Sequence, residues 1–166
     1  MKIDANKTYT AKITTTQGEM TATLLPKEAP MTVNNFVFLA REGFYNGVKF
    51  HRIIKGFMVQ TGDPVGNGSG GPGYTFVDEP VTSNYDKGVL AMANRGPNTN
   101  GSQFFVVHGD DVGQRLPKSY TIFGKITQGI DVLDQIASVP VGSSSSGEMS
   151  APQQDVRITK VDIEER

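Results

Sequence analysis

The chain has 166 residues and a 37% hydrophobic fraction, so it can bury the core of one compact domain, which we expect to span residues 1–166. Sixteen basic against seventeen acidic residues leave almost no net charge, which argues against a nucleic-acid or anionic-membrane partner, since both usually need a basic surface. The absence of cysteine excludes disulfides, thiol catalysis and thiolate metal sites.

Residues 1–7 have no apolar core and predict no signal peptide, and no stretch approaches the length of a membrane span. We therefore expect a cytoplasmic protein, and we take it to be a monomer.

Residues 8–25 predict a β-hairpin, because apolar and polar side chains alternate on both sides of Gln17-Gly18. A helix is expected to begin near Pro30, because apolar residues then recur at helical spacing: Val33, Phe36, Val37 and Ala40. Thr32 is a candidate cap for this helix, and Gly43 is expected to end it.

The rest of the chain predicts short strands, at 48–54, 57–62, 89–93, 103–108, 120–126 and 156–163, with a second helix at 130–137. Loops rich in Gly, Pro, Asn and Ser separate them, at 64–73, 95–102, 109–118 and 140–153. Many short strands with two isolated helices favour a mainly β fold, a closed or nearly closed antiparallel barrel capped by helices.

Arg52 is the most informative residue, because it places a permanent charge inside the largely apolar strand pattern of residues 50–60. A poorly solvated charge is costly unless it is paired or used. No acidic residue lies between Phe44 and Gln60, so a local ion pair is excluded, whereas a distant acid stays open. A carboxylate that locked this guanidinium would argue against a chemical role for it.

A second unusual segment, residues 92–105, lies downstream of Arg52. Strand alternation places Met58 and Gln60 on one face of their strand, and likewise Gln103 and Phe105 on one face of theirs. Two strands could therefore each present an amide and a soft apolar group to a common side.

Other motifs predict no further site. Gly66–Gly71 formally contains G-x-G-x-x-G, but Pro72 and Gly73 follow it and cannot begin the helix that a phosphate-binding loop needs. His51 and His108 are far apart in sequence, which makes a metal site improbable, and alternation sends His51 and Arg52 to opposite faces of a regular strand. We expect no metal and no cofactor.

Two long motifs carry a resemblance to a known family. Phe50–Asp63 and Met92–Phe105 resemble the two signatures of the cyclophilin-type peptidyl-prolyl cis–trans isomerases. The similarity extends to Gly68–Gly71, to Phe123–Lys125 and to the order of strands and helices, so it covers essentially the whole chain.

The resemblance implies a closed eight-stranded antiparallel β-barrel capped by two α-helices, with the active site on its outer face. It also implies a role for each matching residue. Arg52 corresponds to the catalytic arginine, and the peptide site is made of Phe57, Met58, Gln60, Ala93, Asn94, Gln103, Phe105, Leu116 and Tyr120. Alternation does not explain why Phe57 joins Met58, and a bulge or twist near Gly56 is needed.

The implied activity is isomerisation of X–Pro bonds in peptides and folding proteins. The alternative on the same scaffold is a non-catalytic proline-peptide binding module or holdase. The chain has no Trp where eukaryotic members carry one, and Arg115 or a neighbour stands there, so cyclosporin is expected to bind with weakened affinity. Tyr120 stands where those members carry His, which is similar to bacterial members.

Overall fold

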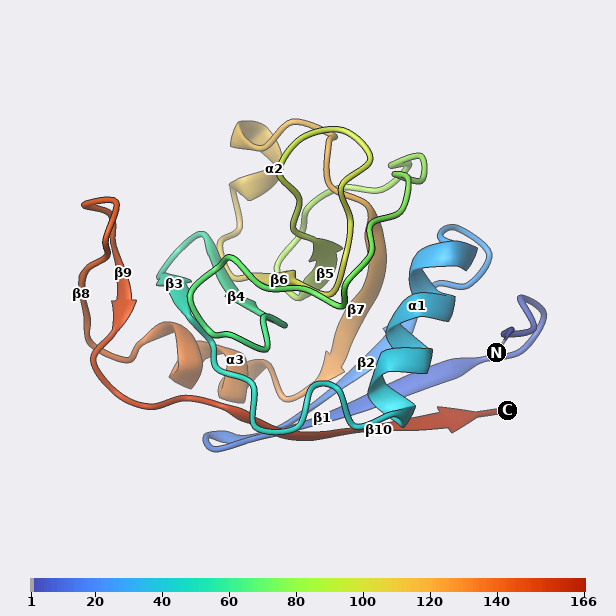
Figure 1. Ribbon diagram of the computed structural model, residues 1–166, viewed down its shortest axis with the longest axis horizontal. Helices are drawn as coiled ribbons and strands as arrows, with labels where there is room; N and C mark the ends of the chain where they lie inside the picture. Colours follow the sequence, from blue (N-terminus) through green and yellow to red (C-terminus); the bar gives the residue numbers. More distant parts are fainter. Residues whose placement is uncertain (1) are drawn as a thin grey trace.

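The computed structural model describes residues 2–166, and its main feature is one curled antiparallel sheet of eight strands (Figure 1). The strands follow the order β10-β1-β2-β7-β5-β6-β4-β3 across the sheet. Their bounds are β1 (Tyr9–Thr15), β2 (Gly18–Leu24), β3 (Arg52–Ile54), β4 (Met58–Thr61), β5 (Val89–Met92), β6 (Phe104–Val107), β7 (Ile122–Gln128) and β10 (Ile158–Glu165). No helix among residues 2–166 is long and apolar enough to cross a membrane.

The expected closed barrel is wrong, because the edge strands β3 and β10 do not pair with each other along residues 2–166. The chain just before β3 approaches the chain leading into β10 through one isolated bridge, Lys49 with Arg157, and the Phe50 N–H donates to the Val156 carbonyl at 2.9 Å. Among the described residues, the three residues of β3 form a ladder with β4 alone. The sheet is therefore a strongly curled half-barrel.

Among residues 2–166, three helices accompany the sheet rather than two: α1 (Pro30–Arg41), α2 (Val112–Arg115) and α3 (Ile130–Ala137). The extra one, α2, is a single turn inside the predicted loop 109–118. The predicted loop 140–153 contains a separate hairpin, β8 (Val141–Ser143) and β9 (Met149–Pro152), which stands beside β3 at the left of Figure 1.

The core lies between the sheet and the helices α1 and α3. Phe36 of α1 is fully buried, and its ring centroid lies 5.3, 5.4 and 5.2 Å from those of Tyr45, Phe104 and Phe123. Contacts of this kind between aromatic rings stabilise a core beyond their buried area. The helix therefore holds β6 and β7 in a fixed position, and the candidate site lies on the opposite side of β6.

The predicted cap of α1 is wrong, because Thr32 lies inside the helix and Ala29 is its N-cap residue. The buried side chain of Glu79 takes the capping role from far along the chain. Its carboxylate accepts the Met31 N–H at 3.2 Å and the Thr32 N–H at 2.7 Å, and the Thr32 hydroxyl donates to it at 2.7 Å. A carboxylate at this end also suits the helix dipole. Gly43 follows the end of the helix with φ 72°, as expected.

Candidate active site

The outer face of β4, β5 and β6 carries a second apolar cluster, separate from the core. Val59 and Phe104 point into the core, whereas their neighbours Met58 and Phe105 belong to the outer cluster. The register pairs Gln60 with Phe105 across β4 and β6. The predicted common side of Met58, Gln60 and Phe105 is therefore confirmed.

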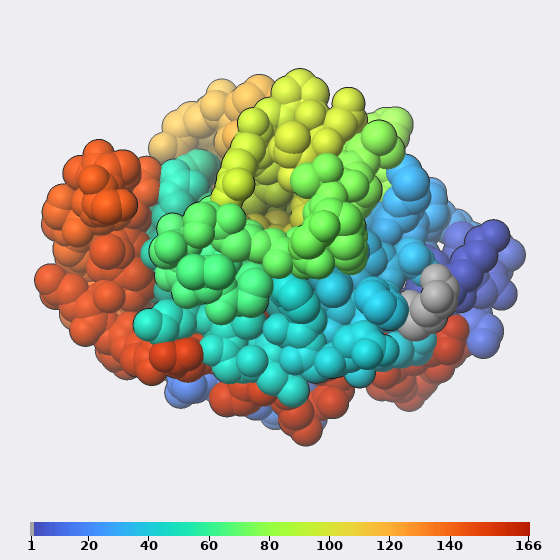
Figure 2. Space-filling view, viewed as in Figure 1, coloured from blue at the N-terminus to red at the C-terminus, as the bar shows by residue number. Residues whose placement is uncertain are grey.

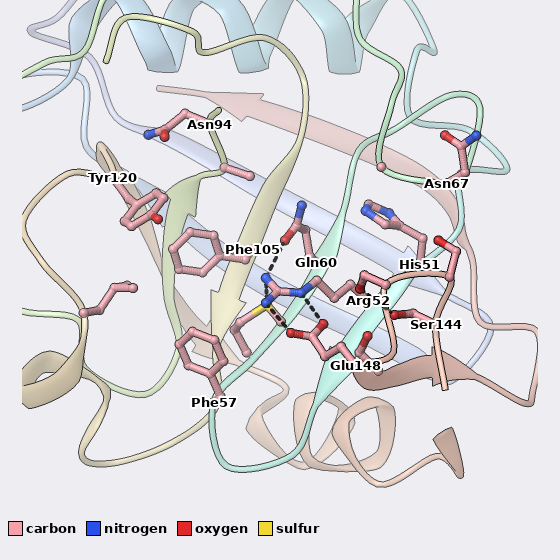
Figure 3. A pocket seen from close by; sticks show the side chains of 17 residues that line it. His51, Arg52, Phe57, Gln60, Asn67, Asn94, Phe105, Tyr120, Ser144 and Glu148 are labelled. Atoms are coloured by element: carbon pink, nitrogen blue, oxygen red, sulfur yellow. Dashed lines mark hydrogen bonds and ion pairs between the residues drawn. The ribbon is translucent and has the colours of Figure 1, made fainter. Parts of the chain in front are cut away.

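A cavity of about 480 Å³ opens over this cluster. Figure 3 shows an aromatic wall of Phe57, Phe105 and Tyr120 on one side and polar side chains on the other, with Arg52 between them. The lining residues are His51, Arg52, Phe57, Met58, Gln60, Asn67, Gly68, Ala93, Asn94, Phe105, Leu116, Tyr120, Ser144, Ser145, Ser146, Glu148 and Ser150. The structure thus brings together every predicted site residue except Gln103, which lines an adjoining cavity that shares Gln60, Ala93 and Asn94.

Phe57 and His51 both reach the cavity because neither lies within a regular strand. Gly56 adopts φ 81° in the turn between β3 and β4, and the Phe57 N–H donates to the Ile54 carbonyl at 3.0 Å. The left-handed conformation suits glycine, which has no Cβ to clash. His51 precedes the first residue of β3, so the expectation that it faces away from Arg52 is wrong.

Arg52 is paired with a carboxylate that lies far away in the sequence. Its Nε donates to Glu148 Oε1 at 2.8 Å and its Nη2 donates to Glu148 Oε2 at 2.9 Å (Figure 3). The hydrogen bond from Arg52 lowers the pKa of Glu148 to about 2, and a hydrogen bond with the Ser150 side chain adds to this. The distant acid that the sequence left open is therefore Glu148. Glu148 occupies the Nε–Nη2 edge of the guanidinium, and Nη1 is directed to Gln60, which lines the cavity.

A chain of amide hydrogen bonds crosses the floor from Arg52. Nη1 of Arg52 donates to Gln60 Oε1 at 3.3 Å, and Gln60 Nε2 donates to Gln103 Oε1 at 3.0 Å. Gln103 Nε2 then donates to the carbonyls of Gly68 and Gly70 at 3.0 and 2.9 Å. An arginine can only donate and a carbonyl can only accept, so the two ends determine the orientation of both amides. Gln103 is thus a support for Gln60, although it lies outside the main cavity.

The loop that supplies these carbonyls is folded around Asp63, which is fully buried. Burial disfavours the charged carboxylate, but backbone N–H donors outweigh it and lower the pKa of Asp63. The N–H groups of Val65, Asn67 and Gly68 donate to it at 2.8, 3.0 and 2.6 Å. Backbone N–H groups of the glycine-rich motif therefore bind a carboxylate of the same chain.

The apolar wall is held by contacts with its neighbours. Phe105 and Tyr120 meet edge to face with ring centroids 5.6 Å apart, and the Tyr120 N–H donates to the Tyr85 hydroxyl at 3.0 Å. The Arg115 guanidinium lies 5.6 Å from the centroid of the Phe57 ring. The side chain of Asn94 is held by its Nδ2, which donates to the Ser119 carbonyl at 2.9 Å.

Sequence reasoning missed the polar wall, which consists of Ser144–Ser146, Glu148, His51 and Asn67. The serine-rich segment indicates only a surface loop, and an acid that pairs over 96 residues leaves no local signal. Burial lowers the pKa of His51, and its Nδ1 has no hydrogen-bond partner in the described part of the chain.

The comparisons with known proteins show the family of this chain. Residues 10–163 match the family model described as cyclophilin type peptidyl-prolyl cis-trans isomerase/CLD. The chain belongs to this family. Among its cyclophilin relatives, peptidyl-prolyl cis-trans isomerase-like 1 of Homo sapiens is 46% identical over 88% of this chain and 87% of its own length. Peptidyl-prolyl cis-trans isomerase-like 3 of Gallus gallus is 44% identical over 88% of this chain and 90% of its own length.

A solved cyclophilin from Cryptosporidium parvum has the same fold. It superposes with a TM-score of 0.86 at 34% identity and covers 95% of this chain and 98% of its own. The same protein was also solved in the presence of the dipeptide Ala-Pro, with a TM-score of 0.85, 34% identity and coverage of 93% of this chain and 98% of its own. The mainly β cyclophilin fold expected from the motifs is therefore confirmed.

Proposed function

We propose that this cyclophilin catalyses cis–trans isomerisation of X–Pro bonds in peptides and folding proteins, with Arg52 as the catalytic residue. The proline ring would occupy the apolar side of the cavity, against Phe57, Met58 and Phe105. The flanking peptide would lie along Gln60, Ala93 and Asn94. Family membership supports the reaction, and the cyclophilin of Cryptosporidium parvum that was solved in the presence of Ala-Pro supports the kind of ligand.

The chemistry requires a donor that acts only when the imide is twisted. Rotation about the X–Pro bond breaks amide conjugation, and the barrier is ~18–20 kcal/mol. The twisted nitrogen regains a localised lone pair and becomes a hydrogen-bond acceptor. A donor that contacts it only at this point binds the transition state selectively, which lowers the barrier. Arginine suits this role because it stays charged and its donors are held in a plane.

The position of Arg52 Nη1 is the observation that carries the proposal. This nitrogen lies 3.3 Å from Gln60 Oε1 and 4.0 Å from Met58 Sδ, and both residues line the cavity. A pyrrolidine ring seated against Met58 and Phe105 would bring its nitrogen toward this donor. No proton transfer is needed, since the reaction makes and breaks no σ bond.

Magnitudes indicate that Arg52 acts together with the apolar wall. Raising a rate of about 0.01 per second to roughly 10–10³ per second requires a ~10³–10⁵-fold acceleration, or ~4–7 kcal/mol. One charge-assisted hydrogen bond contributes about 1.5–3 kcal/mol, and up to ~4 in a pre-organised site. The wall must supply the remainder by holding the ring still and excluding water.

The ion pair with Glu148 is the one observation that favours the alternative, a binding module or holdase without catalysis. A carboxylate on two donors of Arg52 weakens the case for a free cation in the cavity. The pair leaves Nη1 and one N–H of Nη2 without a carboxylate partner, however, and these suffice for one contact with the imide.

Exchange NMR on a short X–Pro peptide separates the two functions. We expect Arg52→Ala to lower the catalysed exchange rate about 100-fold or more, with little change in peptide affinity. Phe105→Ala should instead weaken binding, because it removes a ring of the apolar wall that packs against Tyr120. If Arg52→Ala leaves the exchange rate unchanged while Phe105→Ala loosens binding, the catalytic role of Arg52 is wrong and the binding module is favoured.

A further inference from the structure

Glu148 approaches Arg52 with the geometry of a fork. Two parallel hydrogen bonds of 2.8 and 2.9 Å join the two carboxylate oxygens to Nε and Nη2. Bidentate pairs of this kind constrain both the position and the plane of the guanidinium. The pair is only partly buried, with 36% of the Arg52 side chain and 37% of the Glu148 side chain exposed. Its contribution to stability is therefore small.

Hydrogen bonds of the β8–β9 hairpin fix the backbone of Glu148 within a turn. The Glu148 carbonyl accepts the Ser144 N–H at 2.7 Å and the Ser150 N–H at 3.0 Å, and the Gly147 N–H donates to the Ser144 carbonyl at 2.9 Å. Ser150 is buried, and β9 packs beside β3, the strand that begins with Arg52. In Figure 2 the hairpin forms a lobe at the left edge of the molecule. The side chain of Glu148 therefore reaches Arg52 from a hydrogen-bonded turn.

Orientation matters because a free arginine side chain samples many rotamers. Holding a group at the geometry of the transition state removes an entropy cost from the reaction step. Glu148 takes the Nε–Nη2 edge, and Gln60 restrains Nη1 from the other side at 3.3 Å. One N–H of Nη1 and one N–H of Nη2 remain for another acceptor.

We propose that Glu148 is a positioning residue of this enzyme, which holds the Arg52 guanidinium in the plane from which Nη1 and Nη2 can meet the twisted imide. The inference rests on the proposed role of Arg52 and deepens it. Glu148 acts through Arg52 and does not contact the reacting bond. A carboxylate that competed with substrate for Arg52 would have the opposite effect on the rate, so the two roles can be separated.

A double-mutant cycle tests the proposal, with kcat and KM measured for an X–Pro peptide. In the wild-type background we expect Glu148→Ala to lower kcat about tenfold with KM nearly unchanged. In the Arg52→Ala background the same substitution should change nothing, because Glu148 then has no guanidinium to orient. Glu148→Asp, which keeps the charge on a shorter side chain, should recover part of the rate.

The NMR signal of the Arg52 Nε–H supplies a second readout that does not depend on turnover. It should be resolved and slow to exchange with water in the wild type, and it should broaden or vanish in Glu148→Ala. Asp155→Ala is the matched control, because Asp155 also receives an arginine Nε, that of Arg157 at 2.9 Å, and it does not line the cavity. This variant should keep the wild-type kcat.

Each other outcome overturns the proposal. A higher kcat in Glu148→Ala would identify Glu148 as an inhibitory competitor. An equal loss in both backgrounds would indicate a structural role of the hairpin. If Arg52→Ala abolishes catalysis while Glu148→Ala leaves kcat and the Nε–H signal unchanged, the positioning role fails alone. If Arg52→Ala has no effect on kcat, the proposed catalytic role of Arg52 is wrong, and the positioning role of Glu148 is wrong with it.

Discussion

Arg52 shows how one guanidinium can form an ion pair and still offer N–H donors to a ligand. A guanidinium has five N–H donors, and a carboxylate in fork geometry uses two of them. Lysine could not divide its role in this way, because its ammonium is a point charge without separate edges. The sequence argument that Arg52 needs either a partner or a use was thus incomplete, since the structure gives it a partner on one edge and a cavity on the other.

The stability of the ion pair should depend on pH in a direction set by Glu148. Its pKa falls from the ordinary value of 4.5 to about 2 in the folded protein, so the unfolded chain binds a proton more readily. The pair therefore stabilises the fold fully above about pH 5, and this contribution is lost as the pH falls toward 2. Glu148→Gln should lower the free energy of unfolding at pH 7 by less than about 1 kcal/mol, because the pair is partly exposed.

Urea unfolding at pH 7, 5 and 3 measures this difference between the wild type and Glu148→Gln. We expect the difference to be constant from pH 7 to 5 and smaller at pH 3. A difference that grows as the pH falls would contradict the assigned direction of the pKa shift.

At the scale of elements, the loop after β4 depends on contacts around Asp63. The N–H groups of this loop converge on one buried carboxylate, and its Gly68 and Gly70 carbonyls hold Gln103. A Cβ at Gly70 would overlap the Asp63 carboxylate, whereas a Cβ at Gly71 would meet no atom within 4 Å. Of these two adjacent glycines, Gly70 has no room for a side chain and Gly71 has room for one.

Gly70→Ala should destabilise the protein by about 1–3 kcal/mol, because the new methyl group must displace Asp63 or the loop. It should also lower kcat/KM, since Gln103 and then Gln60 lose their orientation. Thermal unfolding and the peptide exchange assay check both effects. Gly71→Ala is the control and should change neither, and equal effects of the two substitutions would contradict the role given to Asp63.

Helix α1 also depends on a buried carboxylate from another part of the chain, because Glu79 caps its N-terminus. Glu79→Gln keeps the shape of the side chain but removes the charge that accepts two backbone N–H groups and the Thr32 hydroxyl. We expect the free energy of unfolding to fall by about 1–3 kcal/mol, measured by urea unfolding. Glu28→Gln, an exposed acid just before the same helix, should have almost no effect. A loss in Glu28→Gln as large as that in Glu79→Gln would contradict the cap.

The elements that could be predicted from sequence are those with a local periodic signal. The alternation in residues 8–25 predicts β1 and β2, and helical spacing predicts α1 and α3 with the correct bounds of 130–137 for the latter. The short turn α2 and the hairpin around Glu148 have no such period. Phe57 is explained only by the turn at Gly56, and Glu79 and Glu148 act across long sequence separations, which a pattern along the chain cannot reveal.

At the scale of the whole molecule, the sheet separates the hydrophobic core on one face from the candidate active site on the other. Phe104 and Phe105 are neighbours in sequence, yet one belongs to the core around Phe36 and the other to the cavity. The site is therefore built on strands that the core already holds rigid, whereas its polar wall comes from loops and a hairpin. Sites placed on rigid strands keep their geometry better than sites on loops.

The β8–β9 hairpin should open more readily than the main sheet, because it forms a separate two-stranded sheet and no part of it belongs to the ladder of eight strands. Local opening free energies range from near zero in such elements up to the global value in central strands. We expect the Ser144 amide to exchange with deuterium at least about 100-fold faster than the amides of β1 and β2. Glu148→Ala should accelerate exchange in the hairpin further and leave β1 and β2 unchanged, because the ion pair ties the hairpin to β3. Hydrogen exchange followed by NMR at pH 7 measures both, and a hairpin as protected as β1 would contradict this division of the molecule.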